Sequence, residues 1–324
     1  MLYLITILTF LTFSYADYGG GYAGASMRIG ANAREISLSN SMVSISNPGF
    51  NSFTNPALLS RTSDIQLGNS LFLLSQDRNV QILSISRELP PRAGASISIF
   101  RAGVNNIIGI TSNEEVLGEL GYNDIFTMLS FGVKFNQHAS IGFNVKALFQ
   151  NFKISNNEKY SSKGISFDVG VHTSPIDNVD LGVKVENLFG SYNWNQKISS
   201  ESQDYEEILP IRGIFGGSYS FNSLMLLLTF QHEIIYVSSF NSMRSSIGVE
   251  HTLHYHVPIN LRFGLKQNQW AIIEGDKSSF PFVISSGIGF SKLNFMNKLK
   301  LNIDYAFQYT SLGINNFFSI STQL

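Results

Sequence analysis

The chain has 324 residues, and its 22 basic and 23 acidic side chains leave a net charge of −1. It therefore lacks the excess of basic residues that is typical of nucleic-acid-binding proteins. It contains no cysteine, which excludes disulfides, thiolate metal sites and a cysteine nucleophile. Charged residues make up only 14% of the chain, below the roughly 25% of soluble domains, and aromatic residues make up 13%. Because there is also no apolar run of about 18 residues, this composition fits a membrane β-barrel better than a helical membrane protein.

Residues 1–16 are typical of a secretory signal peptide. They carry no charge and are apolar from Leu2 to Phe13. Ser14 and Ala16 then place small residues at the two positions that a signal peptidase reads. The segment lacks a basic start, and a buried N-terminal strand is the alternative. We expect export, with cleavage after Ala16.

Residues 17–60 differ in composition from the rest of the chain and predict a short irregular segment. A Gly- and Tyr-rich stretch at 17–26 is followed by small polar residues and two Asn-Pro dipeptides, Asn47-Pro48 and Asn55-Pro56, which start turns. Apolar residues between them need cover. Two placements fit this composition: a plug folded into a barrel lumen, or a flap on the periplasmic side.

Residues 61–324 repeat a pattern of alternating apolar and polar side chains. The stretch 298–309 shows it most clearly, because six apolar residues from Leu299 to Tyr309 occupy every second position. A two-residue period indicates a strand, and a length of about 20 Å suits a tilted strand that crosses a bilayer. We count about fourteen such segments, at 62–75, 78–88, 93–102, 124–135, 138–153, 163–174, 178–189, 208–221, 223–236, 243–254, 257–267, 279–291, 298–309 and 314–323.

The connections between these segments alternate between short turns and longer polar stretches, as in outer-membrane barrels. We expect the longer ones to be outer loops, at 103–123, 155–162, 190–207 and 268–278. An even number of strands places both termini on the periplasmic side. The predicted fold is all-β, a transmembrane antiparallel barrel of about fourteen strands over 61–324. A soluble β-sandwich, which also alternates, is the competing fold.

Charged residues recur on the predicted inner face of the barrel. On the lipid face, a Lys or Arg at mid-bilayer would cost about 2–4 kcal/mol. The charges have both signs. A mixed set favours internal salt bridges, which stiffen the barrel or hold a plug, and it argues against an ion-selective pore, which would carry charges of one sign. The inner face is otherwise rich in Gly, Ser and Asn, so we expect a filled, polar lumen. The predicted lumen-facing charges are Lys146, Asp168, Lys184, Glu186, Arg262, Lys266, Lys300 and Asp304.

No spacing in the sequence selects a catalytic set of residues. His251, His254 and His256 lie at a predicted strand end and turn, and two of them could share a face, but no acidic or thiol partner is nearby in the sequence. Surface histidines at a turn are the simpler interpretation. We therefore predict a protein that is not an enzyme, with no metal site and no cofactor.

The N-terminal segment carries the most specific motif. Asn55-Pro56-Ala57, within the stretch 47–59, resembles the Asn-Pro-Ala signature of the PorV/PorQ group in the FadL-like superfamily of outer-membrane barrels. Residues 30–34, ending at Arg34, are similar to the Gly-x-x-Ala-Arg element of that group, whereas Leu38-Ser39 departs from its usual Met-Gly. Stretches at 160–170, 181–188, 207–210 and 315–324 resemble the PorQ branch in the same order.

This resemblance implies a fourteen-stranded barrel that serves type IX secretion without catalysis. PorQ-like proteins are similar to components that help place partner proteins at the cell surface. The expected partners are therefore outer-membrane lipids and secretion-system or cargo proteins. The alternative, from FadL-like relatives, is a transporter that passes hydrophobic small molecules. Both alternatives place the chain in the outer membrane of a Gram-negative type of cell.

Overall fold

The computed structural model describes residues 23–110, 113, 116–153, 159–198, 201–237, 240–254, 256–267, 282–295, 299–310 and 312–324. The predicted signal peptide at 1–16 lies outside these residues. In the part of the chain that is described, no helix is long and apolar enough to cross a membrane.

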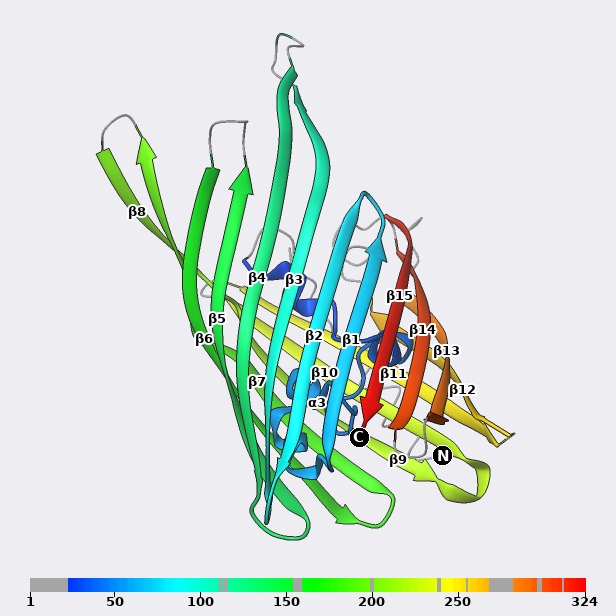
Figure 1. Ribbon diagram of the computed structural model, residues 1–324. Helices are drawn as coiled ribbons and strands as arrows, with labels where there is room; N and C mark the ends of the chain where they lie inside the picture. The colour runs from blue at the N-terminus through cyan, green and yellow to red at the C-terminus, as the bar shows by residue number, and fades with distance from the viewer. Residues whose placement is uncertain are drawn as a thin grey trace.

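Within the described ranges, fifteen strands form one closed antiparallel sheet (Figure 1). Pairing of the last strand with the first closes the barrel. Two short strands, separated by Leu209-Pro210, pair with successive parts of one long neighbour and count as a single strand of a 14-stranded barrel. The predicted closed barrel is confirmed. The strands are β1 Ile65–Leu74, β2 Arg78–Leu89, β3 Ala93–Ile110, β4 Val116–Lys134, β5 Ala139–Lys153, β6 Lys159–Ile176, β7 Val179–Ile198, β8 Glu201–Ile208, β9 Ile211–Phe221, β10 Leu226–Val237, β11 Phe240–His254, β12 Pro258–Gln267, β13 Phe282–Phe295, β14 Leu299–Thr310 and β15 Gly313–Gln323.

Two of the predicted outer loops are wrong. Most of 103–123 continues β3 and β4, and most of 190–207 is a two-stranded ribbon of β7 and β8. Trp194 lies directly opposite Tyr205 in this ribbon, and a cross-strand aromatic pair contributes about 0.2–1 kcal/mol. These ends of β3, β4, β7 and β8 project beyond the barrel (Figure 1), so neither face of the strands needs to be apolar. The strands therefore continue here without the alternation of apolar and polar residues that indicates a strand in the sequence.

The outside of the barrel is apolar where its strands alternate. Leu83, Ile97 and Leu129 are 55%, 58% and 59% exposed, whereas their neighbours in the sequence are buried. Such a surface favours hydrocarbon over water. The continuous ladder of β1–β7 and β9–β15 leaves no strand edge unpaired at this level, as a lipid environment requires.

The N-terminal segment lies inside the barrel (Figure 1). It forms four short helices, η1 Ala25–Arg28, α2 Ala33–Ser37, α3 Asn51–Thr54 and η2 Pro56–Arg61. Helix η2 contacts β2–β6, and α2 contacts β12–β15, so the segment reaches from one wall to the other. Ile36, Leu38, Leu58 and Leu59 are at most 1% exposed, because barrel and segment cover them together. We call residues 31–61 the plug.

Candidate functional site

The Asn-Pro-Ala motif starts helix η2 and ties it to the barrel wall. The Asn55 side chain accepts a hydrogen bond from the Ala57 N–H at 3.1 Å and donates to the carbonyl oxygens of Val43 and Val171 at 3.0 and 3.1 Å. Pro56 takes the first helical position, where a missing N–H costs nothing. Ala57 is completely buried. The motif residues of the plug therefore have a clear structural role.

Residues 55–59 lie directly on the backbone of β3–β6. At that level the inner wall carries Gly94, Gly132, Gly142 and Gly170, which are opposite one another across the four strands. A Cβ atom at any of them would collide with an atom of residues 55–59. Glycine at these positions is what allows two backbones to approach so closely.

Arg34, the remaining motif residue, joins the plug to the opposite wall. Its guanidinium binds both carboxylate oxygens of Glu250 on β11, each at 2.9 Å. Arg262 on β12 then donates to Glu250 at 2.5 Å and to Asp304 on β14 at 2.6 Å. We call these four residues the lower ion cluster. Arg262 and Asp304 were predicted to face the lumen, but nothing in the sequence pairs them with Arg34.

Replacing Arg34 by alanine is expected to lower the free energy of unfolding by about 3 kcal/mol, because Glu250 would stay buried after losing one of its two cations. The thermal midpoint of the detergent-folded barrel, followed by circular dichroism, measures this loss. Arg101→Ala is the matched control, since Arg101 occupies an outward position and, among the described residues, donates to the amide oxygens of Asn79 and Asn123 alone. Equal losses in the two variants would contradict a special role for Arg34.

A second series of ion pairs crosses β7, β9, β10 and β11 nearer the end with the long connections. Lys184 binds Glu186 at 2.6 Å, and Arg212 binds both Glu186 and, at 2.8 Å, Glu233. Arg244 binds the other oxygen of Glu233 at 2.5 Å. We call these five residues the upper ion-pair chain. It connects four strands across the inner wall through charges of alternating sign.

Sequence reasoning identified only part of this chain. Lys184 and Glu186 were predicted to face the lumen, whereas Arg212, Glu233 and Arg244 were missed. Each of the missed residues is a charge at an inward position of a predicted strand, the same signal that identified the others. Lys146 and Asp168, also predicted, pair with each other at 2.8 Å on β5 and β6, and both are buried.

The last two predicted lumen charges form no ion pair with another described residue. Lys266 is half-buried on β12, at the end of the barrel nearer the upper ion-pair chain. Lys300 is exposed on β14 at the opposite mouth. The predicted charges are therefore distributed over both ends of the lumen instead of forming one site.

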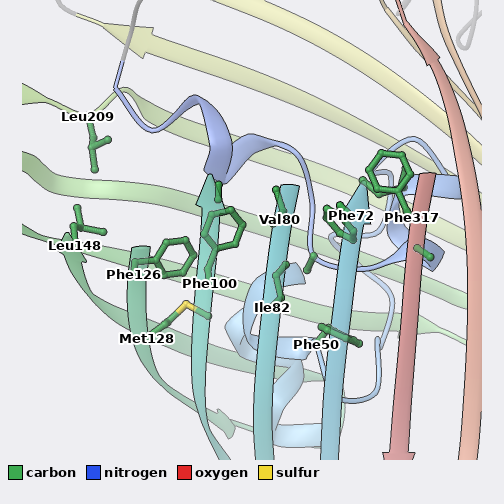
Figure 2. Packing of buried hydrophobic residues seen from close by; sticks show 14 of the residues in the cluster. Phe50, Phe72, Val80, Ile82, Phe100, Phe126, Met128, Leu148, Leu209 and Phe317 are labelled. Atoms are coloured by element: carbon green, nitrogen blue, oxygen red, sulfur yellow. The ribbon is translucent and has the colours of Figure 1, made fainter. Parts of the chain in front are cut away.

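One side of the lumen is apolar, which corrects the expectation of a polar interior. Phe100 stacks on Phe126 with ring centroids 4.7 Å apart, and Phe72 meets Phe317 edge-on at 4.9 Å (Figure 2). Met27 and other apolar residues of the N-terminal segment pack against this surface. We call this surface the apolar wall; it comprises Phe72, Val80, Ile82, Phe100, Phe126, Met128 and Leu148 on β1–β5. Each of these seven side chains is at most 3% exposed.

The sequence does contain a signal for the apolar wall. Adjacent apolar pairs such as Ile82-Leu83, Ile99-Phe100 and Met128-Leu129 break the alternation of β2, β3 and β4. In each pair one side chain faces outward and the other faces the lumen. An apolar pair in a barrel strand thus indicates that both faces are apolar at that level.

A cavity of about 50 Å³ lies where the apolar wall meets the upper ion-pair chain. Phe53, Phe100, Phe126 and Met128 line it, together with the charged residues Lys146, Lys184, Glu186 and Arg212. The site can therefore accept a small apolar group beside cationic side chains.

Two charged residues of the N-terminal segment also line this cavity. Burial raises the pKa of the Glu35 carboxyl above its ordinary value, even though the Ala31 N–H donates to it at 3.0 Å. Burial also lowers the pKa of Arg28 to about 10, with the neighbouring Arg212 acting in the same direction. Both shifts have the same cause, because the plug and the barrel exclude water here.

No family model and no curated protein matches this sequence. Its fold does match solved structures. The CymD monoaromatic hydrocarbon channel aligns with a TM-score of 0.62 and 12% identity, covering 91% of this chain and 96% of that one. A Pseudomonas aeruginosa FadL homologue aligns at 0.63 and 11%, covering 90% and 98%. The Pseudomonas putida toluene transporter TodX aligns at 0.59 and 12%, covering 96% and 97%. The chain therefore shares the barrel fold of these three proteins.

Proposed function

We propose that this chain is a non-enzymatic outer-membrane barrel of the FadL-like superfamily that passes hydrophobic small molecules. The apolar wall carries the proposal. Apolar residues of the N-terminal segment, such as Met27 and Phe53, pack against part of this surface, and the small cavity described above remains beside it. A path for an apolar solute needs such a surface, because an apolar solute leaves water only for surfaces that do not themselves require hydration.

The outward surface supports the proposed location. Large apolar side chains point outward on strands whose ladder is closed, so both the surface and the backbone suit a bilayer. We further propose the division predicted from the sequence, with an N-terminal segment at 17–60, which contains most of the plug, and a barrel from 61 to 324. In this arrangement the lumen charges hold the plug, and the apolar wall forms the path.

Type IX secretion, the function expected from the PorV/PorQ-like motifs, is not supported by the comparisons. Arg34 and Asn55-Pro56-Ala57 bind the plug to the barrel wall, so the fold itself accounts for these motif residues. Surface partners are therefore not needed to explain them. The proposed transport role instead agrees with the solved structures, two of which are named as a hydrocarbon channel and a toluene transporter.

A deletion strain separates the two functions. Uptake of radiolabelled toluene and of a labelled fatty acid is measured beside the amounts of proteins released at the cell surface and into the medium. Transport predicts lost uptake of at least one probe with normal secretion. Normal uptake of both probes with lost secretion would overturn the proposal.

Within the same strain, Phe126→Asn is expected to reduce uptake by about tenfold relative to the wild-type gene. An apolar solute that passes this position would leave the new amide without a hydrogen-bond partner, at a cost of about 1–3 kcal/mol. Phe126→Leu is the matched control, because it keeps the wall apolar. Heat-modifiable migration on gels confirms that both variants fold. Equal uptake by the two variants would show that the solute does not contact this wall.

A further inference from the structure

A second, larger cavity opens at the mouth of the lumen that carries the lower ion cluster. It has a volume of about 620 Å³, and we call it the vestibule. Helix η2 of the plug covers the side formed by β2–β6, whereas the vestibule is lined by β9–β15 and by a few plug residues, Arg34 among them. Asn222 of the short β9–β10 turn and Gln323 at the end of β15 both line it. In the proposed outer-membrane placement, short turns and the chain end face the periplasm, so the vestibule is open to the periplasm.

Most of the charges around the vestibule are already satisfied. The lower ion cluster forms its deep end, and its two arginines and two carboxylates neutralise one another. Lys292 and Lys300 also line the vestibule, and both are exposed. Neither forms an ion pair with another described residue. The vestibule therefore presents two available ammonium groups on its β13–β14 side.

Lys292 lines the vestibule because of a bulge in β13. The register between β13 and β14 shifts between Phe290 and Leu293, and Lys292 adopts a positive φ of 55°. Its N–H donates to the Asn302 side chain at 2.9 Å, which holds this conformation. A bulge redirects side chains, and here both Ser291 and Lys292 line the vestibule although they are adjacent in the sequence.

The side of the vestibule formed by β9 and β10 is apolar. Phe221, Met225, Leu226 and Leu227 line it. All four side chains are partly or fully exposed, so they are not part of a packed core. Leu227 lies on the same face of β10 as Thr229 and Gln231, which are polar and buried. The vestibule thus has an apolar side opposite a basic side.

We infer that the vestibule binds an extended segment of a periplasmic protein that carries both carboxylates and apolar side chains. A single small anion does not match the site, because an exposed lysine binds one charge only weakly. A segment that reaches both lysines and covers the apolar side engages both of these features of the cavity at once. This inference needs the proposed membrane orientation, but it does not depend on which solute the barrel passes.

The experiment uses the full-length protein in nanodiscs of zwitterionic lipid and a fluorescein-labelled peptide of alternating aspartate and leucine. Fluorescence anisotropy should show binding that weakens as salt is added. Lys292→Gln/Lys300→Gln should weaken it by about tenfold, as expected for the loss of two partly solvated charge pairs. Lys292→Arg/Lys300→Arg should retain binding. Lys134→Gln is the matched control, because Lys134 is an exposed lysine at the same mouth but does not line the vestibule.

Three results would overturn the inference. One is equal binding of a peptide in which lysine replaces aspartate. Another is full displacement of the acidic peptide by inorganic phosphate alone, which would make the vestibule a small-anion site. The third is an equal effect of Lys134→Gln and the double glutamine variant. Failure of toluene or fatty-acid uptake in cells would leave this binding unchanged, so the two proposals fail separately.

Discussion

Removing Ser319–Leu324 is expected to abolish insertion of the barrel into the outer membrane. These residues include most of the lower half of β15, where Ser319–Gln323 pairs with β1 on one side and β14 on the other. Without them, two strands in the apolar belt lose their backbone partners. Each unsatisfied backbone group in lipid costs several kcal/mol, so the loss exceeds the stability of a typical domain.

The amount of heat-modifiable barrel in purified outer membranes measures this effect. Deleting 195–203 from the ribbon formed by β7 and β8 is the matched control, because it removes at least as many residues from the chain. Among the described strands, β8 pairs with β7 alone, so β8 lies outside the closed ladder. The control should insert normally. A C-terminal deletion that still inserts, together with a ribbon deletion that does not, would refute the strand order and the orientation.

Deleting residues 27–60 is expected to convert a closed lumen into an open one. The plug reaches from β3–β6, where it lies against the glycine row, to Glu250 on the opposite wall. The remaining wall has inward glycines and small polar residues at that level, which cannot fill the space. Water and ions should therefore enter, because a barrel with no filling forms an aqueous channel.

Planar-bilayer recordings should show a large rise in single-channel conductance for this deletion and none for the deletion of 195–203. Arg34→Ala should lie between them, with brief openings, since it removes only the ion pair that attaches the plug to β11. Unchanged conductance after removal of 27–60 would mean that the segment does not close the lumen. A barrel that no longer inserts would show that the plug is needed for folding, which the gel assay detects separately.

The sequence by itself determined the barrel. A strict two-residue period assigns every side chain to one of two faces. Lys146, Asp168, Lys184 and Glu186, which this period predicts to face the lumen, are buried in the structure. The strand number follows from the same pattern. Lipid requires apolar residues on the outward face of each strand, and it allows turns only at the ends of the strands, outside the bilayer. Where strands project beyond the bilayer into water, this requirement no longer applies. For that reason the sequence predicts a loop where the structure has the ribbon of β7 and β8.

Only the tertiary structure decided which inward residues meet. The two-residue period assigns a strand residue such as Glu250 to a face, but it does not identify the residue that it contacts across the lumen. Its partner Arg34 lies in the plug, 216 positions away in the sequence. The bulge that brings Lys292 into the vestibule is likewise a consequence of strand register. The apolar wall arises because inward Phe100 and Phe126 lie at one height on adjacent strands. Such heights follow from strand tilt and closure of the whole sheet, which no single segment encodes.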